Sequence, residues 1–258
     1  MSDPSSPTAT PHWWGEVAAV FLKDLRSELR TPSAISTLGM FVLTTTVLVS
    51  LTVVTTGPGL DMNALDGDAL KEAVRTGARI YFPGQTLVRA QLLSAFFWII
   101  LYFGALTGIP RVFTKEEEQH TAVLLRLVAR PSAIFAGKLI FNVILLELVA
   151  AAVTPVYLLL LQPVIARPFD FGAHIFVGTA SISGTATLIG AMVSRSGNRG
   201  YLAVILGLGP LLPVLVAGIN GTAAAMQGTG GNYVLGLVSY LGMMTALSAL
   251  LFEKVWRD

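Results

Sequence analysis

The sequence predicts an all-α integral membrane protein with six transmembrane helices, an N-terminal amphipathic interfacial helix and a cytoplasmic coupling helix between spans two and three. Hydrophobic residues make up 53% of the 258 residues and charged residues only 12%, about half the charged fraction of a soluble domain. Several apolar runs reach the roughly 20 residues that a helix needs to cross a bilayer. The chain has no cysteine, which excludes disulfides, thiolate metal sites and haem attached through cysteine.

Two segments precede the expected spans. Residues 1–12 are polar, rich in proline and free of Lys and Arg, so they lack the basic region of a secretory signal and predict a disordered tail. Residues 13–32 predict an amphipathic helix in the cytoplasmic interface, ended by Pro32. Its apolar side chains recur at helical spacing: Trp14, Ala18, Phe21, Leu25 and Leu29. The helix is expected to anchor the first span, and contact with a cytoplasmic partner is the alternative.

Residues 33–258 are expected to form one domain of six spans. The apolar runs that define these spans are 34–56, 90–109, 139–161, 173–194, 201–219 and 233–252. Proline inside two of them, at Pro155, Pro210 and Pro213, is expected to free backbone carbonyls and to kink the helices. Small residues in the fourth span, among them Gly178 and Gly184, predict close contact with neighbouring helices.

The distribution of Lys and Arg predicts the orientation of the spans. With the N-terminus in the cytoplasm, the outside loops hold five of the seventeen basic residues, and the inside segments hold the other twelve. The twelve are Lys23, Arg26, Arg30, Arg111, Lys115, Arg126, Arg130, Lys138, Arg195, Arg199, Lys254 and Arg257. The positive-inside rule therefore favours both termini in the cytoplasm. A net charge of only +2 gives no reason to expect nucleic acid as a partner.

The segment between spans two and three, residues 113–131, is dense in charge and patterned as a helix. Thr114 and Glu117 fit a capping box, and Pro131 is a stop signal, so a helix is expected over residues 115–129. A solvated spacer is the simpler interpretation, but a spacer needs neither a cap nor leucines in helical register. A stiff helix here would suit a moving cytoplasmic partner. The expected coupling residues are Glu116, Glu117, Glu118, Thr121, Leu124, Leu125, Arg126, Arg130 and Lys138.

The run EEEQHTAVLLRLVARPSAIFAGK, from Glu116 to Lys138, resembles the cytoplasmic loop of six-span permeases of ABC exporters. The stretches LLELVAAAVTPVYLLLL and GTATLIGAMVSRSGNRGYLAVILGLGPLLPVLVAGINGTAAA narrow the resemblance to the CcmB family. Members of that family are permeases of the cytochrome c maturation haem exporter. The resemblance extends from Phe21 to the C-terminus and implies that residues 33–258 are a permease domain.

The resemblance also implies partners and a location. It implies a bacterial inner membrane protein that pairs with a second copy of itself, with separate CcmA-type ATPase subunits, with CcmC- and CcmD-type membrane subunits and with a CcmE-type periplasmic haem chaperone. The chain lacks a phosphate-binding loop, so we expect no enzyme activity of its own, with ATP on the partner and haem as a candidate cargo. No cofactor-binding or metal-binding residue is assigned. The alternatives are an exporter of drugs, lipids or polysaccharides and a scaffold for haem-handling partners that transports nothing.

Glu147 is the candidate functional residue inside the membrane. It lies about eight residues into the third span, at a depth of about 12 Å. An ionisable group at such depth is expensive and often marks a functional site. The alternative is that it is paired with Asn142 or with a Ser or Thr of a neighbouring helix and only holds the bundle together.

Overall fold

The chain is described from a computed structural model, which covers residues 12–30, 33–55, 83–118, 129–193 and 199–257. All regular secondary structure in these ranges is α-helical. The helices are α1 (Trp13–Arg30), α2 (Ser33–Thr55), α4 (Pro83–Glu118), α6 (Pro131–Leu161), α7 (Pro168–Val193), α8 (Arg199–Gln227) and α9 (Tyr233–Arg257). Five of them, α4 and α6 to α9, are long and apolar enough to cross a membrane. By length and composition the chain is therefore a multi-pass helical membrane protein.

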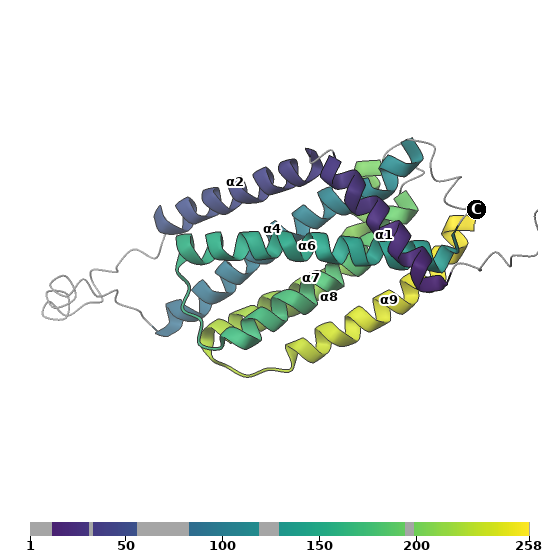
Figure 1. The fold of residues 1–258 in the computed structure, drawn as a ribbon. Coiled ribbons are helices and arrows are strands. Elements are labelled where there is room, and N and C mark those ends of the chain that lie inside the picture. Colours follow the sequence, from purple (N-terminus) through teal and green to yellow (C-terminus); the bar gives the residue numbers. More distant parts are fainter. Residues whose placement is uncertain (1–11, 31–32, 56–82, 119–128, 194–198, 258) are drawn as a thin grey trace, which may run out of the picture.

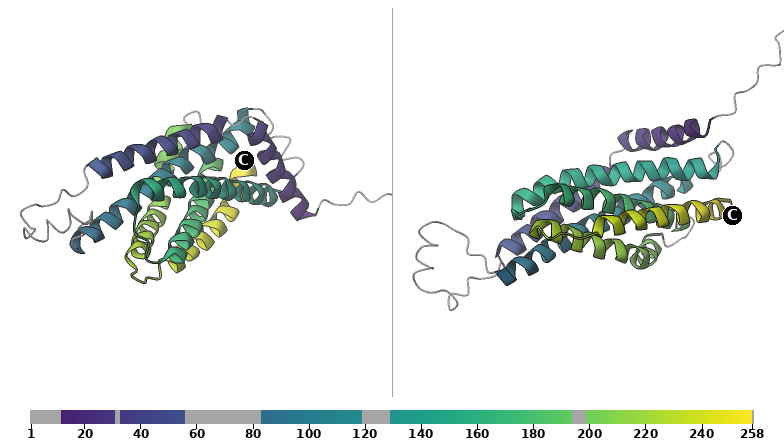
Figure 2. Two further views of the ribbon diagram at one scale, coloured as in Figure 1. Left: turned by 60° about the vertical axis from the view of Figure 1, so that its left-hand side comes forward. Right: turned by 90° about the horizontal axis from the view of Figure 1, so that it is seen from below.

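The helices form an elongated bundle in which successive long helices run in opposite directions (Figure 1). α1 lies obliquely across one end, which we name the α1 end; α6 and α8 begin there, and α4, α7 and α9 finish there. Figure 2 shows α1 as an outer layer on α6 rather than as a member of the bundle. At the opposite end, the loop before α7 meets the last turn of α8, because the Arg167 N–H donates to the Ala225 carbonyl at 3.0 Å.

Helix α7 is the centre of the bundle and contacts α4, α6, α8 and α9. Every residue from 178 to 191 is buried, and most of them are Gly, Ala, Ser or Thr, so neighbouring backbones can approach closely. Four of the five hydroxyls in this helix donate to the carbonyl four residues earlier: Thr179, Ser181, Thr185 and Thr187. The fifth, Ser183, donates to the Asn142 carbonyl of α6 at 3.3 Å. The prediction of close packing along the fourth span is confirmed.

Two glycines of the bundle make room for one large ring. Trp98 of α4 is fully buried, and its indole N–H donates to Thr222 Oγ1 at 3.2 Å. A Cβ on Gly178 would lie 2.1 Å from the ring, and a Cβ on Gly218 would lie 2.5 Å from it. Side chains at either position would overlap the indole, so α7 and α8 clamp the ring of α4 between them.

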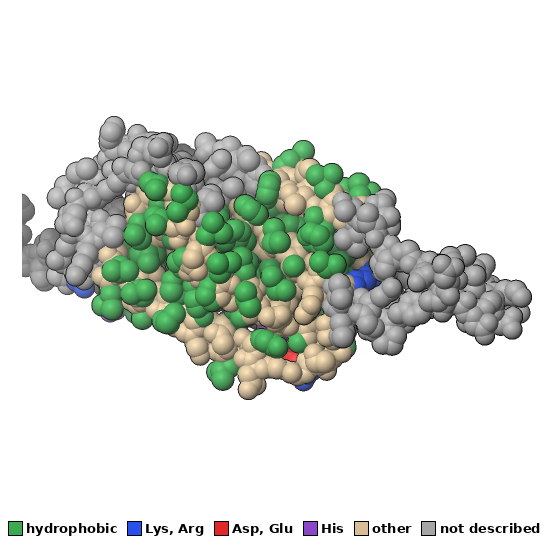
Figure 3. Space-filling view, turned by 180° about the vertical axis from the view of Figure 1, so that it is seen from behind, with side chains coloured by type: hydrophobic (Ala, Val, Ile, Leu, Met, Phe, Trp, Pro, Cys, Tyr) green, Lys and Arg blue, Asp and Glu red, His purple; other side chains and the backbone are tan. Residues whose placement is uncertain are grey.

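The surface along the length of the bundle is apolar. Figure 3 shows hydrophobic side chains over the middle of one face, with Lys and Arg side chains towards its ends. Large exposed hydrophobic residues occur on every long helix, for example Met40, Phe103, Leu148, Leu212 and Leu250. Such a belt would aggregate in water but suits contact with lipid tails.

Helix boundaries differ from the expected spans at both ends of the bundle. α6 begins at Pro131, eight residues before the apolar run at 139, and at 31 residues it is about 46 Å long, against about 30 Å of hydrocarbon. The first expected span corresponds to α2, whose described side chains form a shorter apolar stretch, Gly39–Val49. Helices α6 and α8 continue through Pro155, Pro210 and Pro213.

The predicted start of the coupling helix is wrong. Helix α4 continues through Thr114 to Glu118, so Thr114 is inside a helix and cannot be an N-cap. At the other side of this segment, Arg130 is the N-cap residue of α6 with extended backbone (φ −68°, ψ 142°), and Pro131 is at the first position of that helix. Proline favours a helix start and disfavours helical backbone in the residue before it. Residues 119–128 lie outside the described residues.

Candidate functional site

Two oppositely charged pairs join α1 to the beginning of α6. Glu16 pairs with Arg130, and Asp24 pairs with Lys138. The two acidic residues are eight positions apart in α1, and the two basic residues, the N-cap Arg130 and Lys138 of α6, are also eight positions apart. Eight residues are just over two turns, so each set lies on one face of its helix and the pairs match in register. We name this contact between α1 and α6 the α1–α6 junction.

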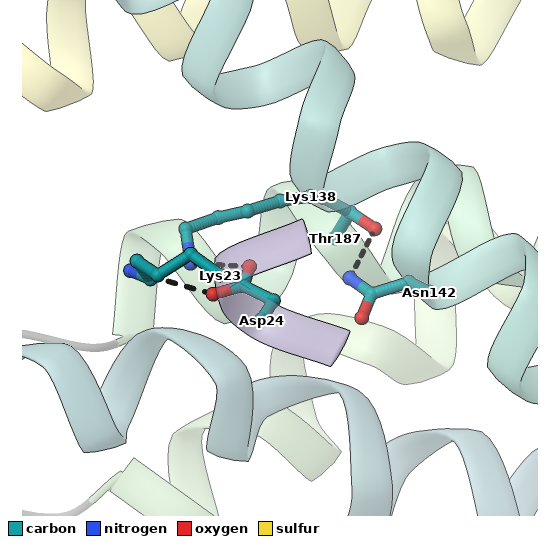
Figure 4. A network of polar contacts seen from close by, with 5 residues as sticks. All are labelled: Lys23, Asp24, Lys138, Asn142 and Thr187. Carbon is teal, nitrogen blue, oxygen red and sulfur yellow. Dashed lines mark hydrogen bonds and ion pairs between the residues drawn. The ribbon is translucent and has the colours of Figure 1, made fainter. Parts of the chain in front are cut away.

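The inner pair of the α1–α6 junction is buried. Lys138 is fully buried, Asp24 is 6% exposed, and Lys138 Nζ lies 3.3 Å from Asp24 Oδ2 (Figure 4). Lys23 Nζ also lies 3.4 Å from Asp24 Oδ1, but this lysine is 42% exposed. A buried charge is tolerated only when it is paired, so Asp24 and Lys138 depend on each other. Their contact fixes α1 to a helix that is long enough to span the membrane.

The outer pair, Glu16 and Arg130, stabilises the start of α6. The Arg130 backbone N–H donates to Glu16 Oε2 at 3.0 Å, and Arg130 Nε lies 3.6 Å from Glu16 Oε1. Arg130 provides no side-chain cap of its own. The Trp13 indole N–H donates to Ser132 Oγ at 3.2 Å. Side chains of α1 therefore supply polar partners that the start of α6 lacks locally.

Between the two charged pairs, α1 and α6 are in close contact. A Cβ on Gly137 would lie 2.8 Å from Val20 Cβ and 2.9 Å from the Val17 carbonyl oxygen, so only glycine fits there. Val20 also belongs to a small buried cluster that joins four helices. Its other members are Ile134 and Phe135 of α6, Ala191 of α7 and Phe252 of α9. A displacement of α1 or of the start of α6 would therefore shift side chains that pack against α7 and α9.

Glu16→Ala is expected to lower the free energy of unfolding by about 1–2 kcal/mol, because the Arg130 N–H loses its acceptor at a helix start. Glu16→Gln keeps an acceptor oxygen and should retain most of that stability. Thermal unfolding of the detergent-purified chain, followed by circular dichroism, measures both. An equal loss in the two variants would mean that the carboxylate charge, not the hydrogen bond, stabilises this boundary.

The structure places the nine expected coupling residues in different parts of the protein. Glu116, Glu117 and Glu118 belong to the last turn of α4, not to the first turn of a separate helix. Four others lie outside the described residues: Thr121, Leu124, Leu125 and Arg126. Arg130 is 60% exposed beside Glu16, whereas Lys138 is fully buried and contacts α1 instead of solvent. The coupling role of all nine stays a prediction.

No protein-family model matches the chain, and no curated protein matches it. Functional inference therefore rests on the contacts of the described residues and on the motif resemblance between Glu116 and Lys138.

Glu147 has the structural pairing that the sequence allowed. Thr179 Oγ1 of α7 lies 2.6 Å from Glu147 Oε1, so the partner is a threonine of a neighbouring helix and not Asn142. Asn142 instead donates from Nδ2 to Thr187 Oγ1 at 2.9 Å (Figure 4). These bonds and the one from Ser183 make a polar seam between α6 and α7. The seam holds two helices together where lipid offers no alternative partners.

The acidic half of the α1–α6 junction was missed in the sequence. The apolar spacing of α1 gives no indication that Glu16 and Asp24 are among its most buried residues. On the opposite side Trp14 is 64% exposed. The available signal was the equal spacing of Glu16 and Asp24 with Arg130 and Lys138. Matched charge spacing on two helices predicts a parallel contact.

Proposed function

We propose that this chain is the permease subunit of an ATP-driven export complex of the CcmB type, which acts in haem export or delivery for cytochrome c biogenesis in the bacterial inner membrane. In this proposal α2 is the first of six spans, and the α1 end faces the cytoplasm with both termini. ATP is hydrolysed on separate CcmA-type subunits. The motif resemblance suggests the family, and the α1–α6 junction supports a mechanical role at this end.

The supporting observation is the anchoring of Arg130, which lies two residues beyond segment 119–128. Arg130 is bonded to Glu16 through both its backbone and its side chain, and α6 starts at the next residue. A force applied by a partner to segment 119–128 would therefore act directly on α6 and α1. The buried cluster around Val20 would then transmit it to α7 and α9. A force applied at one point of the α1–α6 junction could therefore move several helices together.

The partners in this proposal follow from the motif resemblance. A second copy of the chain would complete the transport unit. The CcmC-, CcmD- and CcmE-type proteins would receive haem, which is the proposed cargo and not a resident cofactor. The lipid-facing belt seen in Figure 3 leaves ample apolar surface for membrane subunits.

The variant Leu124→Asp/Leu125→Asp is expected to insert normally but to lose binding of the ATPase subunit, because two charges would replace an apolar docking surface. Co-purification with a CcmA-type ATPase and stimulation of its ATPase rate, which we expect to fall about tenfold or more, are the measurements. The matched control is Leu250→Asp on the exposed face of α9, which should leave the binding unchanged if the variant inserts. Full coupling in the double variant would contradict the docking assignment.

Haem transport itself requires a separate test, because a scaffold would also bind an ATPase. The complex would be reconstituted in sealed vesicles, and ATP-dependent haem movement into the lumen would be measured. ATP-dependent flux supports the exporter. Absence of flux while the chaperone is still loaded and released would contradict transport and favour a scaffold.

A further inference from the structure

Glu147 is an ionisable residue that the protein itself only half covers. It is the seventeenth of the 31 residues of α6, so it lies about 24 Å from Pro131 and about 21 Å from Leu161. Its side chain is half-buried. Any bilayer that α6 spans would therefore contain this carboxyl group near its middle.

The hydrogen bonding of Glu147 is incomplete. Among the described residues its one hydrogen-bond partner is Thr179, at 2.6 Å from Oε1. The Thr179 hydroxyl has a single proton, and it also lies 2.7 Å from the Ile175 carbonyl oxygen. Thr179 therefore cannot always donate to Glu147, and a second donor is needed if the carboxylate is to remain charged in lipid.

The surface around Glu147 has the form of a helix-docking face. Ile144 is 42% exposed and Leu148 is 63% exposed, and Ala151, one turn further along α6, is also exposed. Phe176 of α7, 60% exposed, lies one turn from Thr179. An alanine between larger apolar residues allows a second helix to approach closely. The carboxyl group is thus set in an apolar face that a single helix could cover.

A second copy of this chain does not supply the missing donor. Within the described residues, the basic side chains of the long helices lie near the helix ends, and the one closest to Glu147 along α6, Lys138, is buried against Asp24. A twofold contact through this face would also bring Glu147 of one copy near Glu147 of the other. Charge complementarity instead favours a foreign helix with a cation at the same depth.

We propose that the face formed by Ile144, Glu147, Leu148, Ala151 and Phe176 binds the transmembrane helix of another protein, and that a lysine or arginine near the middle of that helix pairs with Glu147. This interaction is independent of what the complex transports. The pair would be shielded from lipid on one side by α7 and on the other by the docked helix. Neither charged group would be stable at that depth alone.

The test uses a synthetic transmembrane peptide of leucine and alanine with one central lysine, and a matched peptide with leucine in its place. Each peptide carries one cysteine a turn away from the central residue. Because the chain has no cysteine, Ile144→Cys provides a single reporter on the proposed face, and Leu212→Cys on α8 provides a control. Full-length variants are reconstituted with peptide in phosphatidylcholine vesicles, and the rate of disulfide crosslinking is measured.

We expect Ile144→Cys to crosslink to the lysine peptide about tenfold faster than to the leucine peptide, and Leu212→Cys to show no preference. Adding Glu147→Gln, which keeps an acceptor for Thr179, should abolish the preference. Equal rates with both peptides, or a preference that survives Glu147→Gln, would overturn the proposal. Crosslinking of two copies through Ile144→Cys, in place of crosslinking to the peptide, would assign the face to self-association and would overturn it equally.

Discussion

Replacing Lys138 with methionine is expected to lower the free energy of unfolding by about 3 kcal/mol, because Asp24 would stay buried without its main counter-ion. Methionine keeps most of the volume of the lysine stem, so the loss reports the charge and not a cavity. Denaturant unfolding of the purified chain in detergent measures the change. α1 should also become more accessible to protease, since the pair fixes it to α6.

Two variants control this experiment. Lys23→Met removes the other, exposed cation beside Asp24 and should cost about 1 kcal/mol or less. Asp24→Leu combined with Lys138→Met removes both buried charges and should recover most of the stability lost in the single variant. If the double variant were as unstable as Lys138→Met, lost packing and not an unpaired carboxylate would be the cause.

Gly178→Ala is expected to destabilise the bundle by about 1–3 kcal/mol, although alanine favours a helix more than glycine does. The added Cβ would lie 2.1 Å from the Trp98 ring, which is fully buried and bonded to Thr222. The ring cannot move without opening its contact with Gly218. Thermal unfolding in detergent provides the comparison.

The matched control is Gly172→Ala in the same helix. Nothing lies within 4 Å of the Cβ that would be added there, so this variant should be neutral or stabilised by up to about 1 kcal/mol. Combining Gly178→Ala with Trp98→Phe removes the part of the ring that collides, so the two losses should add to less than their sum. Strict additivity would mean that Gly178 and Trp98 do not constrain each other.

The long helices were predicted well from the sequence because each contains a long run of apolar residues. Runs of apolar residues marked α4 and α6 to α9, and the small residues of the fourth span correctly predicted a crowded helix. The helix ends were less accurate, because local sequence signals locate the end of a helix only approximately. Thr114 was misassigned for a related reason: a Thr followed by Glu at the third position fits a capping box, but the pattern cannot exclude that the preceding helix continues.

Contacts between helices were harder to predict than the helices. The pairing of Asp24 with Lys138 depends on which face of α1 docks, and the apolar spacing of α1 alone does not indicate that face. The packing of Trp98 depends on two glycines from different helices, Gly178 and Gly218. The sequence around either glycine does not show that it contacts a tryptophan. The pairing of Glu147 with a neighbouring hydroxyl was among the predictions, because few other donors are available at that depth.

The hydroxyl groups of α7 have a mechanical consequence. Since four of the five donate to carbonyls of their own helix, a short translation of α7 along its axis would leave those donors satisfied. The bonds to neighbouring helices would have to break, because each of the five hydroxyls also has a partner on α6 or α9, as Thr187 has in Asn142. A sliding movement of α7 would therefore cost its contacts with other helices but not its internal hydrogen bonds.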